Sequence, residues 1–252
     1  MEIGTIITPQ VMVALAACDV REAKIWKRAR LSVIATGKEL VPPGEASITP
    51  NSIPDSLSEA LLLLGRQWGA IPMASVRVDD DLSIVEAQAR IAIANSDIVA
   101  VIGGASAGKR DYAKKAFRKA GTQLIWEGVS MKPGKPVWMG KSGSTFVLGL
   151  PGNPTAAITT ARLFLVPLLK ILGGTHKSNA LCWSEIPLAE DFEYNSDRLA
   201  FLSAIFRDGK VSIEKDQRSS GQIRLLTSDG LVRVEPGSGL ITEGTGVPFL
   251  AW

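Results

Sequence analysis

Two lysines each precede a proline in the segment Ser-Met-Lys-Pro-Gly-Lys-Pro, residues 130–136. Proline restricts the backbone before any ligand binds, so Lys132 and Lys135 lose less entropy when their ammonium groups bind an anion. A solvated basic turn is the alternative, but a purely structural turn needs one glycine or proline and gains nothing from lysine. The pattern therefore favours an anion site built on Lys132, Gly134 and Lys135.

A second loop rich in glycine and proline, Gly-Leu-Pro-Gly-Asn-Pro, occupies residues 149–154. It stands directly before a predicted helix, and the free backbone N–H groups of a helix N-terminus suit a phosphate. Because the two loops are close in sequence, we expect them to share one site. The second loop would contribute Gly149, Pro151, Gly152, Asn153 and Pro154.

A glycine-rich turn, Val-Ile-Gly-Gly-Ala-Ser-Ala-Gly-Lys-Arg-Asp-Tyr, spans residues 101–112 between a predicted strand and a predicted helix. Its glycines would free backbone N–H groups for a phosphate. A turn that only serves packing explains the glycines equally well, since the motif matches neither the P-loop nor the dinucleotide fingerprint completely. The binding interpretation predicts contacts from Gly103, Gly104, Ser106 and Gly108, with a cation from Lys109 or Arg110.

Acidic side chains follow several predicted strands, at Glu39, Asp55, the run 79–81 and Asp111. Their oxygen ligands would suit a magnesium ion that is held partly by a substrate phosphate. The three consecutive aspartates are more often a helix cap and a solvated face. Only one histidine is present, His176, which weighs against a Ser-His-Asp hydrolase and against a histidine-ligated metal.

The segments between these loops alternate between strand and helix. Apolar runs predict strands at 30–36, 70–78, 97–104 and 123–128, and residues 136–150 predict a hairpin. Apolar residues at helical spacing predict helices at 57–69, 82–95, 111–121 and 153–174. This order is typical of a doubly wound, mostly parallel α/β sheet, whose ligands bind at the carboxyl ends of the strands.

The pattern changes near residue 177, where short apolar runs are separated by Asp-Gly, Ser-Gly and Pro-Gly turns. These runs, which include 223–227, predict a small all-β, barrel-like domain. The first residues are too few to fold alone, although they include a short predicted helix. We therefore predict an N-terminal remnant or linker at 1–29, an α/β domain at 30–176 and a β domain at 177–252.

Composition narrows the function classes. The net charge of +3, from 28 basic and 25 acidic residues, does not demand a nucleic-acid partner. Cys18 and Cys182 match no disulfide or zinc framework, which favours a reducing compartment. No signal-peptide pattern opens the chain, and no apolar run is expected to be a membrane span. We expect a cytoplasmic protein with no nucleic-acid and no membrane partner.

Five motifs in fixed order point to a known family: VIATGKEL (33–40), ITPNS (48–52), the glycine-rich turn, SMKPGKP and GLPGNP. In this order and spacing, the chain resembles the central and C-terminal domains of the molybdopterin molybdenumtransferases, a family that includes the gephyrin E domain. The resemblance runs from about residue 10 to the C-terminus. It includes SDRLAFLSAIF, SSGQIRLLTSDGLV and GTGVPF in the predicted β domain.

The resemblance implies a molybdopterin-binding fold and a transferase reaction. Molybdate would be inserted into adenylylated molybdopterin, giving molybdenum cofactor and AMP with Mg²⁺ or another divalent cation. The implied catalytic carboxylates are Glu39, Asp79, Asp80 and Asp111, and Glu39, Asp80 and Asp111 would bind the metal. The implied substrate contacts are Thr36, Gly37, Asn51 and Ser52, together with the residues named above in the three loops.

The chain also differs from the family that it resembles. The family's elongated N-terminal domain contributes to the site across a homodimer and is not found in this sequence, so we expect a homodimer or a partner that supplies this domain. Lys38 and Lys109 stand where the family usually has acidic residues, which predicts weaker cation binding. Two alternatives stay open: a molybdopterin adenylyltransferase, whose glycine-rich loop is similar, and a non-catalytic molybdopterin carrier or scaffold.

Overall fold

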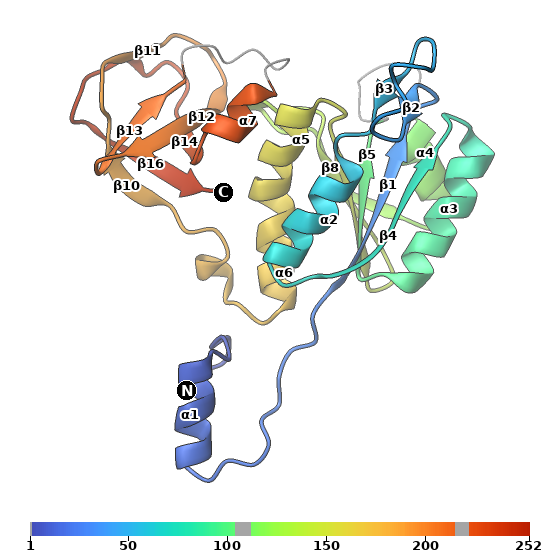
Figure 1. Cartoon of the computed structure of the whole chain (residues 1–252), viewed down its shortest axis with the longest axis horizontal. Coiled ribbons are helices and arrows are strands. Elements are labelled where there is room, and N and C mark those ends of the chain that lie inside the picture. Colours follow the sequence, from blue (N-terminus) through green and yellow to red (C-terminus); the bar gives the residue numbers. More distant parts are fainter. Residues whose placement is uncertain (1, 104–111, 215–221) are drawn as a thin grey trace.

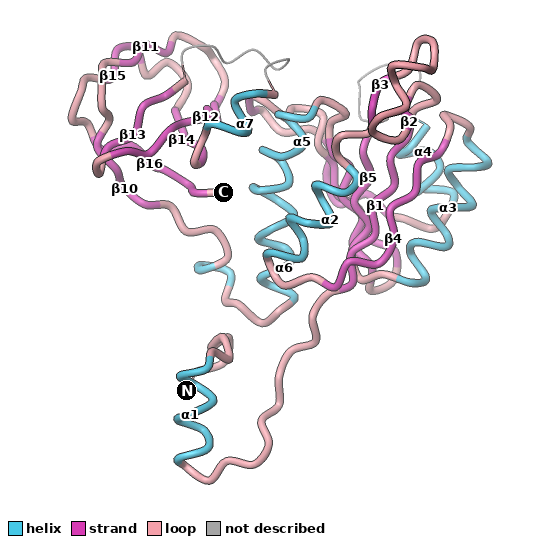
Figure 2. Tube along the Cα trace, viewed as in Figure 1, coloured by secondary structure: helices cyan, strands magenta, loops and turns pink. Residues whose placement is uncertain are grey.

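The structure is a computed structural model that describes residues 2–103, 112–214 and 222–252 (Figure 1). These residues form an α/β domain, a smaller β domain and an N-terminal arm. Figure 2 shows the same view coloured by secondary structure, with the strands of the larger sheet gathered beside the helices that cover them.

A six-stranded sheet forms the centre of the α/β domain, in the order β4-β1-β5-β9-β8-β6. Its strands are β1 (Arg30–Thr36), β4 (Ile71–Val78), β5 (Ile98–Ile102), β6 (Gln123–Glu127), β8 (Trp138–Ser142) and β9 (Thr145–Leu150). The first four strands in this order run parallel, and β8 runs antiparallel to both of its neighbours. The predicted mostly parallel sheet and the predicted hairpin are confirmed.

Helices cover both faces of this sheet (Figure 1). The helix α2 (Ser58–Gln67) and the continuous run α5 (Pro154–Thr160), η1 (Ala161–Leu165) and α6 (Val166–Leu172) pack on one face. The helices α3 (Leu82–Asn95) and α4 (Tyr112–Lys119) pack on the other. Alternation along β1 divides its side chains between the two cores, with Leu31 and Val33 in one and Ile34 in the other. The domain is therefore doubly wound, as the sequence predicts.

The run from α5 to α6 departs from two expectations. It is one helix in outline, but its middle turn is a π-helix, with the buried Arg162 in that turn. By length and composition alone, Pro154–Leu172 could also cross a membrane, although no apolar run was expected to approach a membrane span. Within the fold, 61% of its apolar window is buried. This burial is what a core helix of a globular domain requires.

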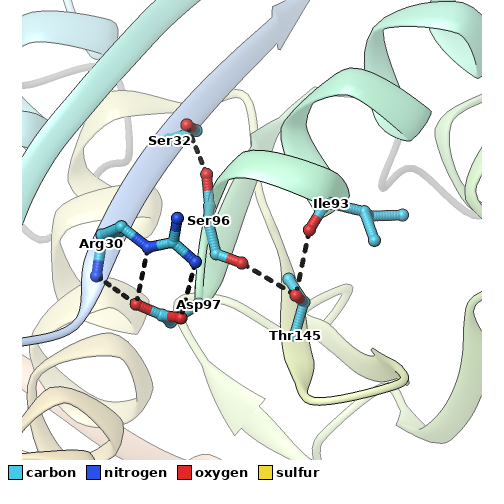
Figure 3. Close-up of polar contacts among 6 residues, drawn as sticks. All are labelled: Arg30, Ser32, Ile93, Ser96, Asp97 and Thr145. Atoms are coloured by element: carbon cyan, nitrogen blue, oxygen red, sulfur yellow. Dashed lines mark hydrogen bonds and ion pairs between the residues drawn. The ribbon is translucent and has the colours of Figure 1, made fainter.

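A polar network joins three strands at the edge of the sheet where they begin (Figure 3). The Asp97 carboxylate accepts hydrogen bonds from the Arg30 backbone N–H at 2.8 Å and from the Arg30 guanidinium at 3.1 and 3.2 Å. The Ser32 and Ser96 hydroxyls lie 2.7 Å apart, and the Thr145 hydroxyl donates to the Ser96 carbonyl at 2.8 Å. The network therefore holds β1, β5 and β9 in register at this edge.

The β domain is a curled sheet in the order β10-β16-β14-β12-β13, and β7 (Met131–Lys132) also pairs with β12. Its strands are β10 (Ser184–Pro187), β12 (Leu199–Arg207), β13 (Lys210–Ile213), β14 (Gly230–Val234) and β16 (Gly246–Ala251), with β11 (Phe192–Tyr194) and β15 (Gly239–Ile241) paired separately. A parallel bridge between Leu188 and Val211 brings the two edges of the sheet together. The domain is therefore barrel-like, as predicted.

One predicted β segment is a helix. Residues Ile223–Thr227 form the short helix α7 and not a strand. The apolar residues Ile223 and Leu226 are three positions apart, which places both on one exposed helical face, and the run lacks the strict alternation of a half-buried strand.

The helical part of the N-terminal arm lies away from both domains (Figure 1). Its helix α1 (Pro9–Ala17) begins at Thr8, whose hydroxyl accepts a hydrogen bond from the Val11 N–H, and buries none of its residues. The segments on either side of α1 return to the α/β domain near Trp68 and Gly173, where they enclose a cavity of about 890 Å³. The remaining short elements are β2 (Leu40–Val41), β3 (Ile53–Pro54) and η2 (Lys177–Asn179).

Candidate functional site

A cavity of about 470 Å³ opens at the carboxyl ends of β1, β4, β5 and β9. It is lined by Thr36, Glu39, Leu40, Ile53, Pro54, Asp55, Ser56, Leu57, Asp80, Ile102, Gly103, Gly152, Pro154 and Gln222. We call this space the switch-point cavity. The chain leaves β1 through α2 toward β4 and leaves β5 through α4 toward the opposite end of the sheet, so the winding direction reverses between β1 and β5. Ligands of open α/β sheets bind at this reversal.

Glycine lets three loops approach one another beside the cavity. Gly103 has a φ of +84°, and a Cβ atom there would lie 2.6 Å from the Thr36 carbonyl oxygen. A Cβ atom on Gly152 would lie 3.7 Å from the Gly103 Cα. The Gly103 N–H donates to the Leu150 carbonyl at 3.3 Å, which joins the ends of β5 and β9. The predicted contacts at Gly103 and Gly152 thus lie at the cavity, while Gly104, Ser106, Gly108, Lys109, Arg110 and Asp111 lie outside the described residues.

The loop after β1 places Glu39 beside the cavity. The Gly37 N–H donates to the Val78 carbonyl at 3.1 Å, which ties this loop to the end of β4. A Cβ atom on Gly37 would lie 2.8 Å from a Glu39 carboxylate oxygen, so the Glu39 side chain folds back over Gly37. The Thr36 hydroxyl donates to the Ile102 carbonyl at 3.3 Å. Thr36 and Glu39 line the cavity as predicted, whereas Gly37 shapes the loop beneath them.

The three consecutive aspartates separate into different positions. Asp80 lines the switch-point cavity, and Asp79 is exposed outside its lining. Asp81 is the N-cap of α3, where it accepts hydrogen bonds from the Ser83 hydroxyl and from the Ser83 and Ile84 N–H groups. The Ser83 hydroxyl is the main reason why the pKa of Asp81 is below its ordinary value. The cap expected for this run therefore falls on Asp81, which leaves Asp80 at the cavity.

Asp55 lines the cavity but was only an acidic candidate in the sequence. Its Oδ1 accepts hydrogen bonds from the Leu57 and Ser58 N–H groups at 3.2 and 3.0 Å, and its Oδ2 lies 3.5 Å from Arg77. Burial favours the neutral form, but the hydrogen bonds from Ser58, Leu57 and Arg77 outweigh it, so the pKa of Asp55 is below its ordinary value. The cavity therefore has a third carboxylate that is held ionised.

The segment before β3 shows where the resemblance and the geometry differ. Asn51 and Ser52 are not among the cavity residues, while Ile53 and Pro54, which follow directly, are. Asn51 has a φ of +57°, and the Ser52 hydroxyl donates to the Thr49 carbonyl at 2.7 Å. In this structure both residues shape the turn that leads into β3.

Residues 128–137, which we call the lysine loop, do not line the switch-point cavity. The loop follows β6, which runs in the same direction as β9, so it lies at the same edge of the sheet. In the strand order β6 is three strands from β5, or about 14 Å at the usual spacing of sheet strands. One strand, β8, lies between β6 and β9, so the lysine loop and the GLPGNP loop are two strand spacings apart, or about 10 Å. That the two loops share one site stays a prediction.

Hydrogen bonds within the lysine loop give it a defined shape. The Gly128 and Val129 N–H groups donate to the Val137 and Lys135 carbonyls, each at 2.9 Å, and the Val137 N–H donates to the Gly134 carbonyl at 3.0 Å. Lys132 and Lys135 are exposed, and neither makes an ion pair or a side-chain hydrogen bond within the described part of the chain. Their charges are thus available to an anion.

The residues of the GLPGNP loop have two roles: some are packed in the interior, and others line the switch-point cavity. A Cβ atom on Gly149 would overlap the indole of the fully buried Trp138, so Gly149 is required for packing, and its substrate contact stays a prediction. Asn153 is the N-cap of α5 and accepts a hydrogen bond from the Ala156 N–H at 3.2 Å. Pro151 is buried, whereas Gly152 and Pro154 line the cavity.

The carboxylates can accommodate a magnesium ion only in part. No group of three or more His, Cys, Asp or Glu side chains is assembled for a metal among the described residues. Glu39 and Asp80 nevertheless line the same cavity, and Mg²⁺ is often bound by one or two carboxylates together with substrate phosphates. The donor set therefore fits a cation that arrives with a phosphorylated ligand better than a metal caged by protein alone.

The fold and the switch-point cavity define a ligand-binding domain of the doubly wound α/β class. Comparison with known proteins identifies the family: residues 32–171 match the family described as a probable molybdopterin binding domain. This match covers more than half of the chain, and the chain belongs to that family. Residues 185–252 match a second family, described as the MoeA C-terminal region, domain IV.

Named relatives and a solved structure agree with these matches. A molybdopterin molybdenumtransferase from Nostoc sp. is 31% identical, over 94% of this chain and 56% of its own length. A relative of the same name from Synechococcus elongatus is 27% identical, over 97% of this chain and 60% of its own length. The crystal structure of a molybdopterin biosynthesis MoeA protein from Pyrococcus horikoshii superposes with a TM-score of 0.82 at 25% identity, over 98% of this chain and 60% of that protein. The chain thus spans little more than half the length of these relatives.

Proposed function

We propose that this chain binds adenylylated molybdopterin and takes part in the insertion of molybdate into it, with release of AMP. The main support is the switch-point cavity, which is lined by Glu39, Asp80, Gly103 and Gly152. The same edge of the sheet carries Lys132 and Lys135, which have no side-chain partner among the described residues. The names of the relatives supply the substrate class.

The edge of the sheet where the strands end has an acidic part, the switch-point cavity, and a basic part, the lysine loop. Glu39, Asp55 and Asp80 make the described part of the cavity acidic, and neither lysine nor arginine is among its described lining residues. A phosphate would be repelled there unless a cation accompanied it. Lys132 and Lys135, about three strand spacings away, can hold a second anionic group. An elongated ligand with separated anionic groups suits this arrangement, and adenylylated molybdopterin has that form.

We assign Mg²⁺ to Glu39 and Asp80, and the resemblance adds Asp111, which lies outside the described residues. When bound, the cation would neutralise phosphate charge and make the phosphoanhydride easier to cleave. The chain's own groups bind and orient the ligand through the glycine backbone and the lysines. In the overall reaction the two dithiolene sulfurs replace one oxygen of molybdate, which leaves as water, and cleavage of the phosphoanhydride takes up one water.

We also propose the wider context of the chain. The α/β domain extends over 30–176 and the β domain over 177–252, with 1–29 as the arm. We expect a homodimer or another partner chain, and a cytoplasmic location. A functional assay should therefore include the oligomeric state of the sample, measured by light scattering.

The decisive experiment incubates the purified full chain with adenylylated molybdopterin, with and without molybdate and Mg²⁺, and measures AMP. The transferase proposal predicts AMP release only when molybdate is present. Consumption of ATP with free molybdopterin would replace it with an adenylyltransferase. Tight binding without turnover would replace it with a carrier or scaffold. Failure to bind the pterin at all would overturn the proposal.

A further inference from the structure

The lysine loop belongs structurally to the β domain, although its sequence lies inside the α/β domain. Its first residues form β7, which pairs with β12 in the register Met131 with Leu199 and Lys132 with Ala200. The strand that carries Lys132 is therefore part of the β domain's sheet. Residues 131–132 thus connect the two domains, because they continue the chain of the α/β domain and pair with a strand of the β domain.

The side chain of Met131 continues this connection into an apolar core. Met131 is 1% exposed and belongs to a cluster with Phe201, Leu231 and Leu250 of the β domain and Leu163 of the long helix. Four separate segments of the chain therefore surround it. A buried methionine in such a place fixes the position of its backbone, because neighbouring atoms fill the space on all sides.

Met131 also supports the turn between the two lysines from within. The position that a Cβ atom on Gly134 would occupy lies 3.0 Å from the Met131 methyl group and overlaps the Thr160 side chain of α5. Gly134 has a φ of +101° and is buried, so the turn rests directly on these two side chains. The lysine loop is thus clamped between α5 and the β domain.

We infer that Met131 is a positioning residue, through which the β domain holds Lys132 and Lys135 in the arrangement that binds the anionic substrate. The β domain then has a role in the site in addition to Gln222, its one described residue that lines the switch-point cavity. This inference rests on the proposed function, because it takes the two lysines as substrate-binding groups. It adds a specific task for the β domain and names the side chain that performs it.

The first test measures the loop itself and needs no ligand. Met131→Ala should speed hydrogen exchange at the Val129 and Val137 amides, which close the lysine loop, by about tenfold or more. Leu202→Ala is the matched control, because Leu202 is 3% exposed on β12 but belongs to the other apolar cluster of the β domain. Leu202→Ala should leave those two amides unchanged. Equal exchange in the wild-type and Met131→Ala chains would overturn the inference, whatever the function.

The second test measures the affinity for adenylylated molybdopterin by calorimetry without molybdate. Met131→Ala should weaken binding about five- to tenfold, and Leu202→Ala less than twofold. When Met131→Ala is added to the Lys132→Ala, Lys135→Ala double variant, no further weakening should appear, because Met131 acts through those lysines. Additive losses would overturn the inference alone. If the lysine variants bind as tightly as the wild type, the lysine assignment in the proposed function fails, and the exchange result still decides whether Met131 holds the loop.

Discussion

At the scale of single residues, this site depends on two kinds of position: cations without partners and glycines without room for a side chain. Lys132 and Lys135 are of the first kind, since both are exposed and neither is paired within the described residues. Gly103 is of the second kind, because Thr36 lies where its Cβ atom would be. The two kinds of position predict different effects of mutation. Replacing a lysine should affect ligand binding, and replacing a glycine should affect local structure.

The lysines should affect affinity and not folding. Lys132→Ala and Lys135→Ala should each weaken binding of adenylylated molybdopterin by about 10- to 100-fold, which corresponds to about 1.5–3 kcal/mol for a lost charge-assisted hydrogen bond. Calorimetry gives the affinity, and the melting temperature should change by less than about 2 °C. Lys177→Ala, at an exposed turn, is the control for a general loss of charge. Unchanged affinity in both lysine variants would contradict the anion site.

Gly103→Ala should disturb the switch-point cavity. The alanine Cβ would lie 2.6 Å from the Thr36 carbonyl oxygen, and a φ of +84° is unfavourable for any side chain. We therefore expect the free energy of unfolding to fall by about 1–3 kcal/mol and ligand binding to weaken. Gly143→Ala separates these causes, because Gly143 also has a positive φ, +56°, but nothing lies within 4 Å of its Cβ position. Urea unfolding and calorimetry of both variants test this. A similar loss in the two variants would mean that backbone strain alone explains the effect.

At the scale of elements, the two edges of the larger sheet have different tasks. The edge where the strands end carries loops for a ligand, while the edge where they begin carries the network of Arg30, Asp97, Ser32, Ser96 and Thr145 (Figure 3). That network connects residues from different strands through side chains, so it stabilises the register and leaves the opposite edge free for irregular loops. Its contribution should therefore appear in stability and its pH dependence.

Asp97→Asn tests this network through pH. Hydrogen bonds from Arg30 hold the pKa of Asp97 below its ordinary value of 3.8, although partial burial opposes the shift. A lowered pKa in the folded state means that the stabilisation is present above pH 3.8 and disappears as the pH falls through the folded-state value. At pH 7 the variant should melt roughly 2–4 °C below the wild type, since the pair is partly exposed.

The difference between the two proteins should shrink as the pH is lowered below 3.8. Melting curves recorded by circular dichroism from pH 7 down to pH 3 would measure it. A constant difference across this range would show that the Asp97 charge is not the source of the effect. AMP release at pH 7 should be the same for both proteins, because the network lies at the edge away from the cavity.

At the scale of the whole molecule, the two domains are held together by more than the peptide that links them. The cluster around Met131 contains residues of both domains, and β7 crosses from one to the other. Arg162, in the π-helical turn, adds a polar contact: its Nε donates to the Ala251 carbonyl at 2.7 Å, and its guanidinium lies 4.8 Å from the centre of the Trp68 ring. Burial lowers the pKa of Arg162 to about 10, which leaves it charged at neutral pH.

Arg162→Ala should therefore weaken the connection between the domains. The Ala251 carbonyl would lose its partner in a partly buried place, at a cost of about 1–3 kcal/mol. Scanning calorimetry should show one cooperative transition for the wild type and a lower or divided transition for the variant. Arg90→Ala is the control, because Arg90 pairs with Glu86 on the exposed side of α3. If both variants melt like the wild type, the Arg162 contact contributes nothing to domain association.

The sequence alone determined most of the elements, their order and the family, because these depend on local patterns. Residues 82–95 were predicted as a helix and form α3 with those bounds, since an apolar stripe and a capping aspartate are both visible in a short window. The loops at the strand ends were located for the same reason, as glycine and proline mark them directly. Glu39, Asp80, Gly103 and Gly152 at one cavity follow from knowing that parallel strands end at one edge.

Only the tertiary structure decided how the parts of the site relate to one another. It placed the lysine loop on the β domain, gave Gly149 to the packing of Trp138, and brought Asp55 to the cavity. Each of these outcomes depends on contacts that local spacing does not encode: Met131 meets residues near 200, 231 and 250, which lie about 70 or more positions away in sequence. Such contacts form only when complete helices and strands pack against one another, so the role of each single residue depends on the folded structure.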